Sequence, residues 1–224
     1  MKLSSNTTMV LKNFATINQN LVIKEGSELL TMSSMKNIVA KATVEENFPK
    51  EFAIYDLNEF LASLSIFKSP VLEFEEQYLT IKEEDQPHKK LTYFYSDPSV
   101  VQSPTKTITM PSEEVKFHLD MNKLLEMKRA AGVIGSPDMV LQKSSGNSSL
   151  LVKDKKNDTA NNYSSDISTD GDGEYKFFFK VENLKLFDGD YDVKISSKNI
   201  SHFKNDKSNI EYWIALEPES TYSN

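Results

Sequence analysis

The sequence lacks cysteine entirely and has little histidine, glycine or arginine. Its 224 residues include no Cys, seven Gly and three His, which are His88, His118 and His202. Without Cys there can be no disulfide, thiolate nucleophile or Cys-ligated zinc. No His stands in a Gly-x-Ser-x-Gly motif, and no Gly-rich phosphate loop is present. We therefore expect a protein with no catalytic residue and no cofactor.

Long apolar runs are also missing. The segment Lys176–Lys180 has only three consecutive Phe, far fewer than a bilayer-spanning helix needs. The start of the chain, Met1–Thr8, has no apolar stretch typical of a signal peptide. These features predict an intracellular protein without membrane association.

Negative charge exceeds positive charge. The net charge is −7, while 38% of residues are hydrophobic and 26% are charged. Both percentages are ordinary for a globular protein, and the length fits one or two domains. An acidic balance argues against a protein that coats nucleic acid with its whole surface.

One acidic segment, Asp166–Glu174, has the oxygen spacing and the Gly171 of a calcium loop. Its twelfth position is Phe177, where such a loop needs a bidentate Glu. We therefore expect a solvated hairpin loop and no metal site.

Apolar periodicity predicts helices and strands in the first half of the chain. A helix is expected over Asn6–Asn18, and Asp56 with Glu59 forms a capping-box pattern before a second helix ending near Leu64. Alternation and turn residues predict strands at 21–24, 29–33, 37–44, 51–55, 71–74, 78–83 and 90–95.

The second half begins after a Pro-rich stretch, Ser96–Pro111, that reads as a linker. Asp120 is expected to cap a helix with Met121, Leu124 and Leu125 on its apolar side. Further predicted elements are strands at 115–119, 139–141, 150–153, 176–180, 191–196, 200–203 and 210–216, a mobile loop at 153–173 and a brief helix at 181–187.

The order of elements repeats with an offset of ~120 residues, which indicates internal duplication. The series strand, helix and three strands from Glu51 to Tyr95 recurs from Lys176 to Leu216. The sequence therefore predicts an α+β protein with two similar domains of antiparallel sheets, at residues 1–108 and 109–224.

Several residue strings resemble the sliding clamp of T-even-type bacteriophages, the processivity factor of the phage DNA polymerase. The strings run in order along the whole chain: Met1-Lys2-Leu3-Ser4, Thr7-Thr8, Leu11–Asn18, Ala53–Asn58, Phe60-Leu61, Asp97-Pro98-Ser99, Gly189-Asp190-Tyr191, Ala215-Leu216-Glu217 and Ser220-Thr221. The first block is long and specific, whereas the later ones are short.

The resemblance implies a homotrimeric ring that encloses double-stranded DNA without reading its sequence, with helices lining the hole. It also implies three kinds of protein partner. They are the C-terminal peptide of the polymerase, which binds the clamp, an ATP-driven clamp loader, and late-transcription factors. Such a protein would act in the cytoplasm of the infected bacterial host. A clamp makes and breaks no bond, in accord with the missing catalytic motifs.

Under this resemblance, the DNA-facing candidates are Lys12 on the first helix and Lys123 and Arg129 on the third. The alternative for each is an ordinary solvated helix charge. Lys128 falls nearer the apolar side, and we expect it to extend to solvent.

Three positions make the expected hole less positive than in relatives. Ser5 stands where Lys is common, Glu59 is on the second helix and Glu126 is on the third. Direct DNA affinity is therefore expected to be weak.

The resemblance also implies an apolar pocket for the polymerase peptide near the domain junction. Met110, Pro218 and Tyr222 are candidates for its lining, and ordinary packing of linker and tail is the alternative. The competing hypothesis for the whole chain is a β-rich protein-binding module that does not encircle DNA.

Overall fold

The computed structural model describes residues 1–104 and 108–223 and divides the chain into two compact units, Met1–Lys106 and Thr107–Asn224. The predicted linker includes positions 105–107, which lie outside the described residues. The domain boundary after residue 108 stays a prediction. Among the described residues, no helix is both long and apolar enough to cross a membrane.

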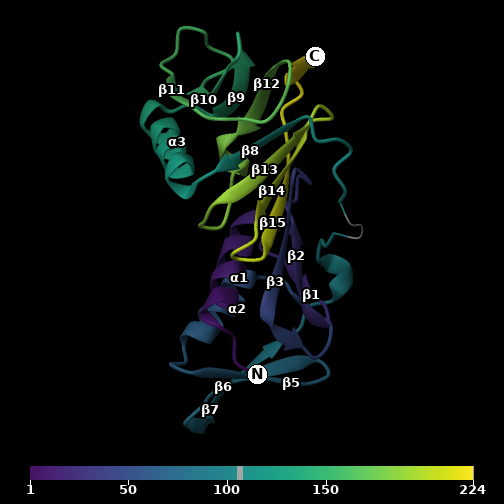
Figure 1. The fold of residues 1–224 in the computed structure, drawn as a ribbon. Coiled ribbons are helices and arrows are strands. Elements are labelled where there is room, and N and C mark those ends of the chain that lie inside the picture. The colour runs from purple at the N-terminus through teal and green to yellow at the C-terminus, as the bar shows by residue number, and fades with distance from the viewer. Residues whose placement is uncertain (105–107, 224) are drawn as a thin grey trace. The chain divides into compact units, whose positions relative to one another are not determined.

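Among its described residues, unit 1 contains two α-helices and strands arranged in two antiparallel sets (Figure 1). Its helices are α1 (Ser5–Ile17) and α2 (Leu57–Ser65), and a 3-10 turn, η1 (Pro98–Val100), follows the sheets. The strands of the first sheet are β1 (Leu21–Ile23), β2 (Gly26–Met32), β3 (Ile38–Phe48) and β4 (Phe52–Ile54). Those of the second are β5 (Pro70–Phe74), β6 (Tyr78–Glu83) and β7 (Gln86–Phe94).

In the part of unit 2 that the structure describes, there is one α-helix, α3 (Met121–Ile134), and one 3-10 turn, η2 (Val181–Asn183). Its first sheet has β9 (Asp138–Ser144), β10 (Asn147–Lys153), β11 (Tyr163–Asp166), β12 (Glu174–Lys180) and β16 (Thr221–Ser223). Its second has β8 (Val115–Leu119), β13 (Tyr191–Ser196), β14 (Ile200–Asn205) and β15 (Ile210–Ala215).

The strand order confirms that the two units share one topology. The first sheet runs β4-β1-β2-β3 in unit 1 and β12-β9-β10-β11 in unit 2, so the fourth strand of each set pairs with the first. The second sheet runs β5-β6-β7 in unit 1 and β15-β14-β13 in unit 2, and β8 and β16 are additional edge strands of the unit 2 sheets. Helix α1 therefore corresponds to α3, and α2 corresponds to η2.

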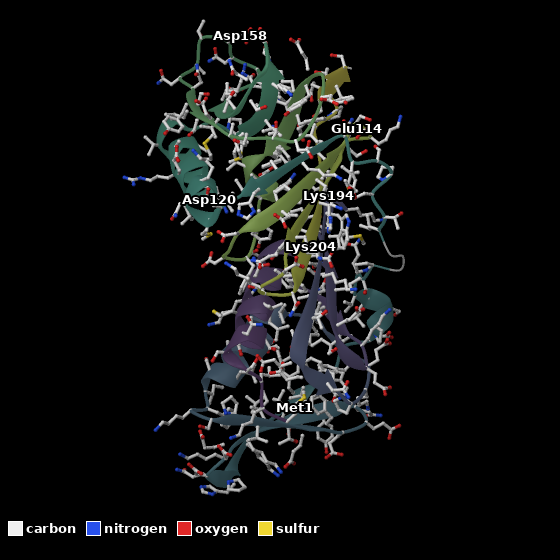
Figure 2. All side chains as sticks on the ribbon, viewed as in Figure 1. Met1, Glu114, Asp120, Asp158, Lys194 and Lys204 are labelled. Carbon is white, nitrogen blue, oxygen red and sulfur yellow. The ribbon has the colours of Figure 1, made fainter. Side chains whose placement is uncertain are left out.

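Local capping explains where the helices begin. The Ser4 hydroxyl accepts a hydrogen bond from the Thr7 amide (3.1 Å) ahead of α1, and the Asp56 carboxylate accepts one from the Asn58 amide (2.9 Å) ahead of α2. Asp120, labelled at the start of α3 in Figure 2, accepts one from the Lys123 amide (2.8 Å). The predicted caps at Asp56 and Asp120 are confirmed.

Apolar side chains from both sheets of unit 2 meet in one core. Phe117 and Phe203 from one sheet and Met139, Leu150 and Phe179 from the other line a common apolar space. In unit 1, α1 buries Val10, Leu11, Phe14 and Ile17, in agreement with its predicted face.

The predicted helix over 181–187 is wrong beyond its first turn. Only Val181–Asn183 forms η2, and the chain then extends. Leu184 and Leu186 are both buried, a spacing of two that suits an extended segment better than a helix. Unit 2 therefore has a single α-helix among its described residues.

Two short strands were missed by the sequence analysis. β11 lies inside the predicted loop at 153–173 and pairs with β10, and β16 pairs with β12 near the C-terminus. Both are short and mostly polar because they lie at sheet edges, where side chains need no apolar alternation.

Candidate nucleic-acid interface

Lys12 is an exposed side chain on α1. Within residues 1–104 and 108–223 it forms no ion pair, so its positive charge is uncompensated locally. On α2, Glu59 is also exposed, and α1 and α2 pack against each other. The helices of unit 1 thus carry one exposed cation and one exposed anion.

A buried carboxylate anchors the N-terminal end of α1. Glu46, on β3, is 8% exposed and accepts hydrogen bonds from the Ser4 amide and from the hydroxyl of the fully buried Thr7. Burial raises the pKa of Glu46, but the hydrogen bonds from Thr7 and Ser4 outweigh it and hold the pKa below its ordinary value. This contact fixes α1 to the sheet.

The sequence analysis missed Glu46, although a signal was present. Val44, Glu46 and Phe48 occupy alternate positions on the buried face of β3. A carboxylate in such an apolar register must have partners, because an unpaired buried charge is strongly unfavourable.

Lys123 is tied to the neighbouring strand β11 by polar contacts. Its ammonium donates to the Ser165 hydroxyl and lies 3.4 Å from a Glu126 carboxylate oxygen. Tyr163 donates its phenolic hydrogen to Glu126 (2.7 Å), and this hydrogen bond lowers the pKa of that carboxyl group. Lys123 is therefore partly neutralised, and it contributes less free positive charge than its sequence position indicates.

Arg129, the single arginine, is exposed on α3 and lines an open depression of about 600 Å³ beside β11. Leu125 and Val133 also line it and are 50% and 79% exposed. The prediction that Leu125 belongs to the apolar, buried side of α3 is wrong, because Leu124, Met127 and Ala131 form that side.

Lys128 does not extend to solvent as predicted. Its ammonium donates to the backbone carbonyl of Leu184 (2.9 Å), and burial lowers its pKa. The extended chain after η2 thus provides the acceptor, which the sequence did not reveal because a helix was predicted there.

The three candidate pocket residues come from two segments of unit 2. Met110 is half-buried in the extended segment before β8. Pro218 is exposed in a turn after β15, and Tyr222 is half-buried in β16, with its ring stacked on Phe177 at a centroid distance of 6.4 Å. The joint pocket of Met110, Pro218 and Tyr222 stays a prediction.

The acidic loop at 166–174 is held by protein groups. The Lys143 ammonium donates to the Gly171 carbonyl (2.6 Å), and the backbone of Asp170 pairs with that of Lys116. Gly171 approaches Val115 so closely that an added Cβ would lie 2.9 Å from a methyl carbon. In the described part of the chain, no three His, Cys, Asp or Glu side chains gather to hold a metal.

Two of the three histidines make polar contacts with carboxylates. His118 lies 3.0 Å from the Asp192 carboxylate, and His202 lies 2.8 Å from Glu211 while stacking on Trp213. Both rings thus lie within hydrogen-bond distance of a carboxylate on the neighbouring strand, and these contacts orient the two side chains.

Comparison with known proteins identifies relatives over the full chain. A family model described as DNA polymerase processivity factor matches residues 2–101, and one described as gp45 sliding clamp, C terminal, matches residues 116–218. The sliding clamp of Vibrio phage KVP40 is 33% identical over 223 residues, covering 97% of this chain and 99% of the relative. The sliding clamp of Enterobacteria phage T4 is 29% identical, with 99% of each chain covered.

Solved structures share the fold at much lower identity. The proliferating cellular nuclear antigen of Entamoeba histolytica superposes with a TM-score of 0.68 at 12% identity, covering 96% of this chain and 97% of that one. The PCNA2–PCNA3 complex of Sulfolobus tokodaii gives 0.63 at 11%, covering 96% of each chain. These likenesses confirm the predicted DNA clamp fold with its antiparallel sheets. The matching family models and the 33% identity over almost the whole chain show that this protein belongs to the T4-type phage family of sliding clamps, which are non-enzymatic DNA polymerase processivity factors.

Proposed function

We propose that three copies of this chain close into a ring around duplex DNA and tether the phage DNA polymerase in the cytoplasm of the infected bacterium. The observation that carries the proposal is the duplicated unit, because repeated domains with sheets and helices can continue one circular arrangement from copy to copy. An ATP-driven loader would open the ring, and late-transcription factors would be further users of the loaded clamp.

Two free strand edges support ring closure. In the described residues, β7 pairs only with β6, and β11 pairs only with β10. Unpaired edge groups are templates for strand addition by another chain. Pairing β7 of one copy with β11 of the next gives a head-to-tail contact, which closes into a ring if the rotation allows. β7 carries Lys89 and Lys90, whereas β11 ends at Asp166, so the charges are complementary.

Ring closure is tested by cross-linking, because the chain has no native cysteine. Thr92→Cys in β7 and Ser164→Cys in β11 are both at exposed positions. Under oxidation, the double variant should form covalent species up to three times the 25.5 kDa chain mass, whereas each single variant should not form this series. A monomer at all concentrations in light scattering, with no cross-linking, would refute the ring.

The DNA-facing role of the helices rests on Lys12 and Arg129, the exposed helix cations without an ion pair in the described residues. Sequence-independent DNA binding depends on neutralising phosphates, so the logarithm of the binding constant falls linearly with the logarithm of the salt concentration. Removing one cation that binds a phosphate makes this slope less steep by roughly 0.9. Lys123 joins the proposed interface with a smaller contribution because Glu126 lies beside it.

Charge reversal tests this role against the binding-module alternative. Lys12→Glu with Arg129→Glu should reduce processive synthesis on primed circular DNA, while binding of the polymerase C-terminal peptide persists. Lys24→Glu, at an exposed lysine in the turn before β2, is the matched control. Unchanged processivity in the double variant would favour a module that does not encircle DNA.

The polymerase peptide is proposed to bind at Met110, Pro218 and Tyr222. Two of these side chains lie in the C-terminal segment of unit 2 and offer a proline and an aromatic ring to an apolar peptide. Tyr222→Ala should weaken binding of that peptide, whereas Tyr78→Phe in unit 1 should not.

A further inference from the structure

The C-terminal segment 217–223 lies along the outer edge of β12 and is called the strap here. The Glu217 amide donates to the Phe178 carbonyl (2.9 Å), and the Phe178 amide donates to the Ser220 hydroxyl (3.0 Å). The Ser220 amide in turn donates to the Glu217 carbonyl (3.0 Å) and closes a turn with Pro218 at its second position, which suits the fixed φ of proline. β16 then pairs with residues 174–176 of β12.

Five charged side chains, the strap cluster, join the strap to the body of unit 2. They are Asp138, Lys155, Lys180, Glu217 and Glu219. The Lys155 ammonium lies 2.7 Å from Glu217 and 2.9 Å from Glu219, and the Lys155 side chain is only 10% exposed. Lys180 lies 2.6 Å from the fully buried Asp138 and 3.8 Å from Glu217. Within this cluster, Lys155 is thus the side chain that contacts both acids of the strap.

Besides its ion pairs, the strap is held by a short strand ladder and one aromatic contact. Pro218 and Glu219 are exposed, and β16 has only three residue pairs with β12. The ring of Tyr222 stacks on Phe177. A segment with a short ladder and few buried apolar groups opens locally at lower free energy than the sheet beneath it.

We propose that the strap is a releasable element, fastened by Lys155, that opens while β9, β10 and β12 stay folded. Pro218 and Tyr222 belong to the strap, so its closure assembles the polymerase-peptide pocket and its opening removes these two side chains. This last consequence rests on the proposed function, whereas the opening itself does not.

Hydrogen exchange measured by mass spectrometry tests the opening in the full chain. Lys155→Met keeps the length and apolar stem of the side chain and removes its charge. Lys153→Met is the control, because the Lys153 ammonium lies 3.9 Å from the exposed Asp158 and contacts no strap residue in the described structure. Exchange of the 217–223 peptide should rise about tenfold in Lys155→Met and stay unchanged in Lys153→Met.

Salt provides a second test, and its first measurement uses the wild-type chain alone. Raising the NaCl concentration should speed strap exchange in the wild-type chain, because Glu219 is 58% exposed and screening weakens its pair with Lys155. The same change should have little effect in Lys155→Met. Equal strap exchange in wild type and Lys155→Met, or faster exchange of β9 and β10 together with the strap, would overturn the proposal.

The coupling to the pocket is measured with a labelled synthetic peptide of the C-terminal residues of the polymerase encoded by the same phage. Its affinity should fall severalfold for Lys155→Met and not for Lys153→Met. If the wild-type clamp did not bind the peptide, the proposed pocket would be wrong while the exchange result would still decide the strap. Equal peptide affinity with a released strap would overturn the coupling.

Discussion

Removal of the Glu46 carboxylate is expected to loosen α1, the helix that carries Lys12. In Glu46→Ala the Thr7 hydroxyl and the Ser4 amide lose their acceptor. Thr7 is fully buried, so water cannot replace the lost partner, whereas Ser4 is half-buried and can recover part of its hydrogen bonding. A buried donor left unpaired costs ~1–3 kcal/mol, so the variant should lose about 2–3 kcal/mol of unfolding free energy.

The effect should depend on pH in a defined direction. The pKa of Glu46 is lowered in the folded chain, so its contribution is fully present above the unfolded pKa of about 4.5 and is lost as pH falls through the folded pKa. Glu46→Gln keeps one acceptor oxygen and should lose less stability at pH 7. Its stability should also change less between pH 6 and pH 3 than that of the wild-type chain.

Urea unfolding followed by far-UV circular dichroism measures these changes. The single tryptophan, Trp213, lies in unit 2 and provides a separate fluorescence signal for that unit. Glu45→Ala is the control because Glu45 is the adjacent exposed residue of the same strand. If Glu46→Ala were as stable as Glu45→Ala, or lost stability only in the Trp213 signal, the anchoring role would be refuted.

Two further predictions concern unit 2. Gly189→Ala should lower the unfolding free energy of this unit by at least ~2 kcal/mol. The reason is that Gly189 has a φ of 143° and an added Cβ would lie 2.2 Å from the buried Asn205 amide nitrogen. Gly132→Ala, at a position within α3 where an added Cβ meets no atom within 4 Å, should be neutral or stabilising in urea unfolding. Tyr163→Phe removes the hydrogen bond that lowers the pKa of Glu126, so an NMR titration should show that pKa rising towards its ordinary value, and an unchanged pKa would contradict the contact.

Much of the architecture follows from local patterns. The buried residues of α1 and α2 recur every three or four positions. Asp56 and Asp120 cap their helices by accepting hydrogen bonds from backbone amides two or three residues later in the chain. These interactions span few residues, so the sequence contains all the information that they need. The duplication was also visible because the order of elements is a property of the chain itself.

The candidate site could be predicted only in part. Lys12 lies on the exposed face of a regular helix, so its solvent exposure follows from periodicity. The environment of Lys123 does not follow from periodicity, because its partner Ser165 lies in β11, an edge strand whose sequence has no apolar alternation. Lys128 likewise meets Leu184 only because the chain after η2 is extended.

The sequence by itself determined the α+β class, the repeated order of elements and the positions of the helix charges, because these depend on spacing and capping within short segments. The tertiary structure decided which charges stay free. It brings Glu46 beneath α1, Ser165 beside Lys123, and Lys155 onto the acids of the C-terminal strap, over separations of 39, 42 and 62 residues. A charge is neutralised by whatever lies within a few ångströms of it, and for distant segments only the folded chain sets that neighbourhood.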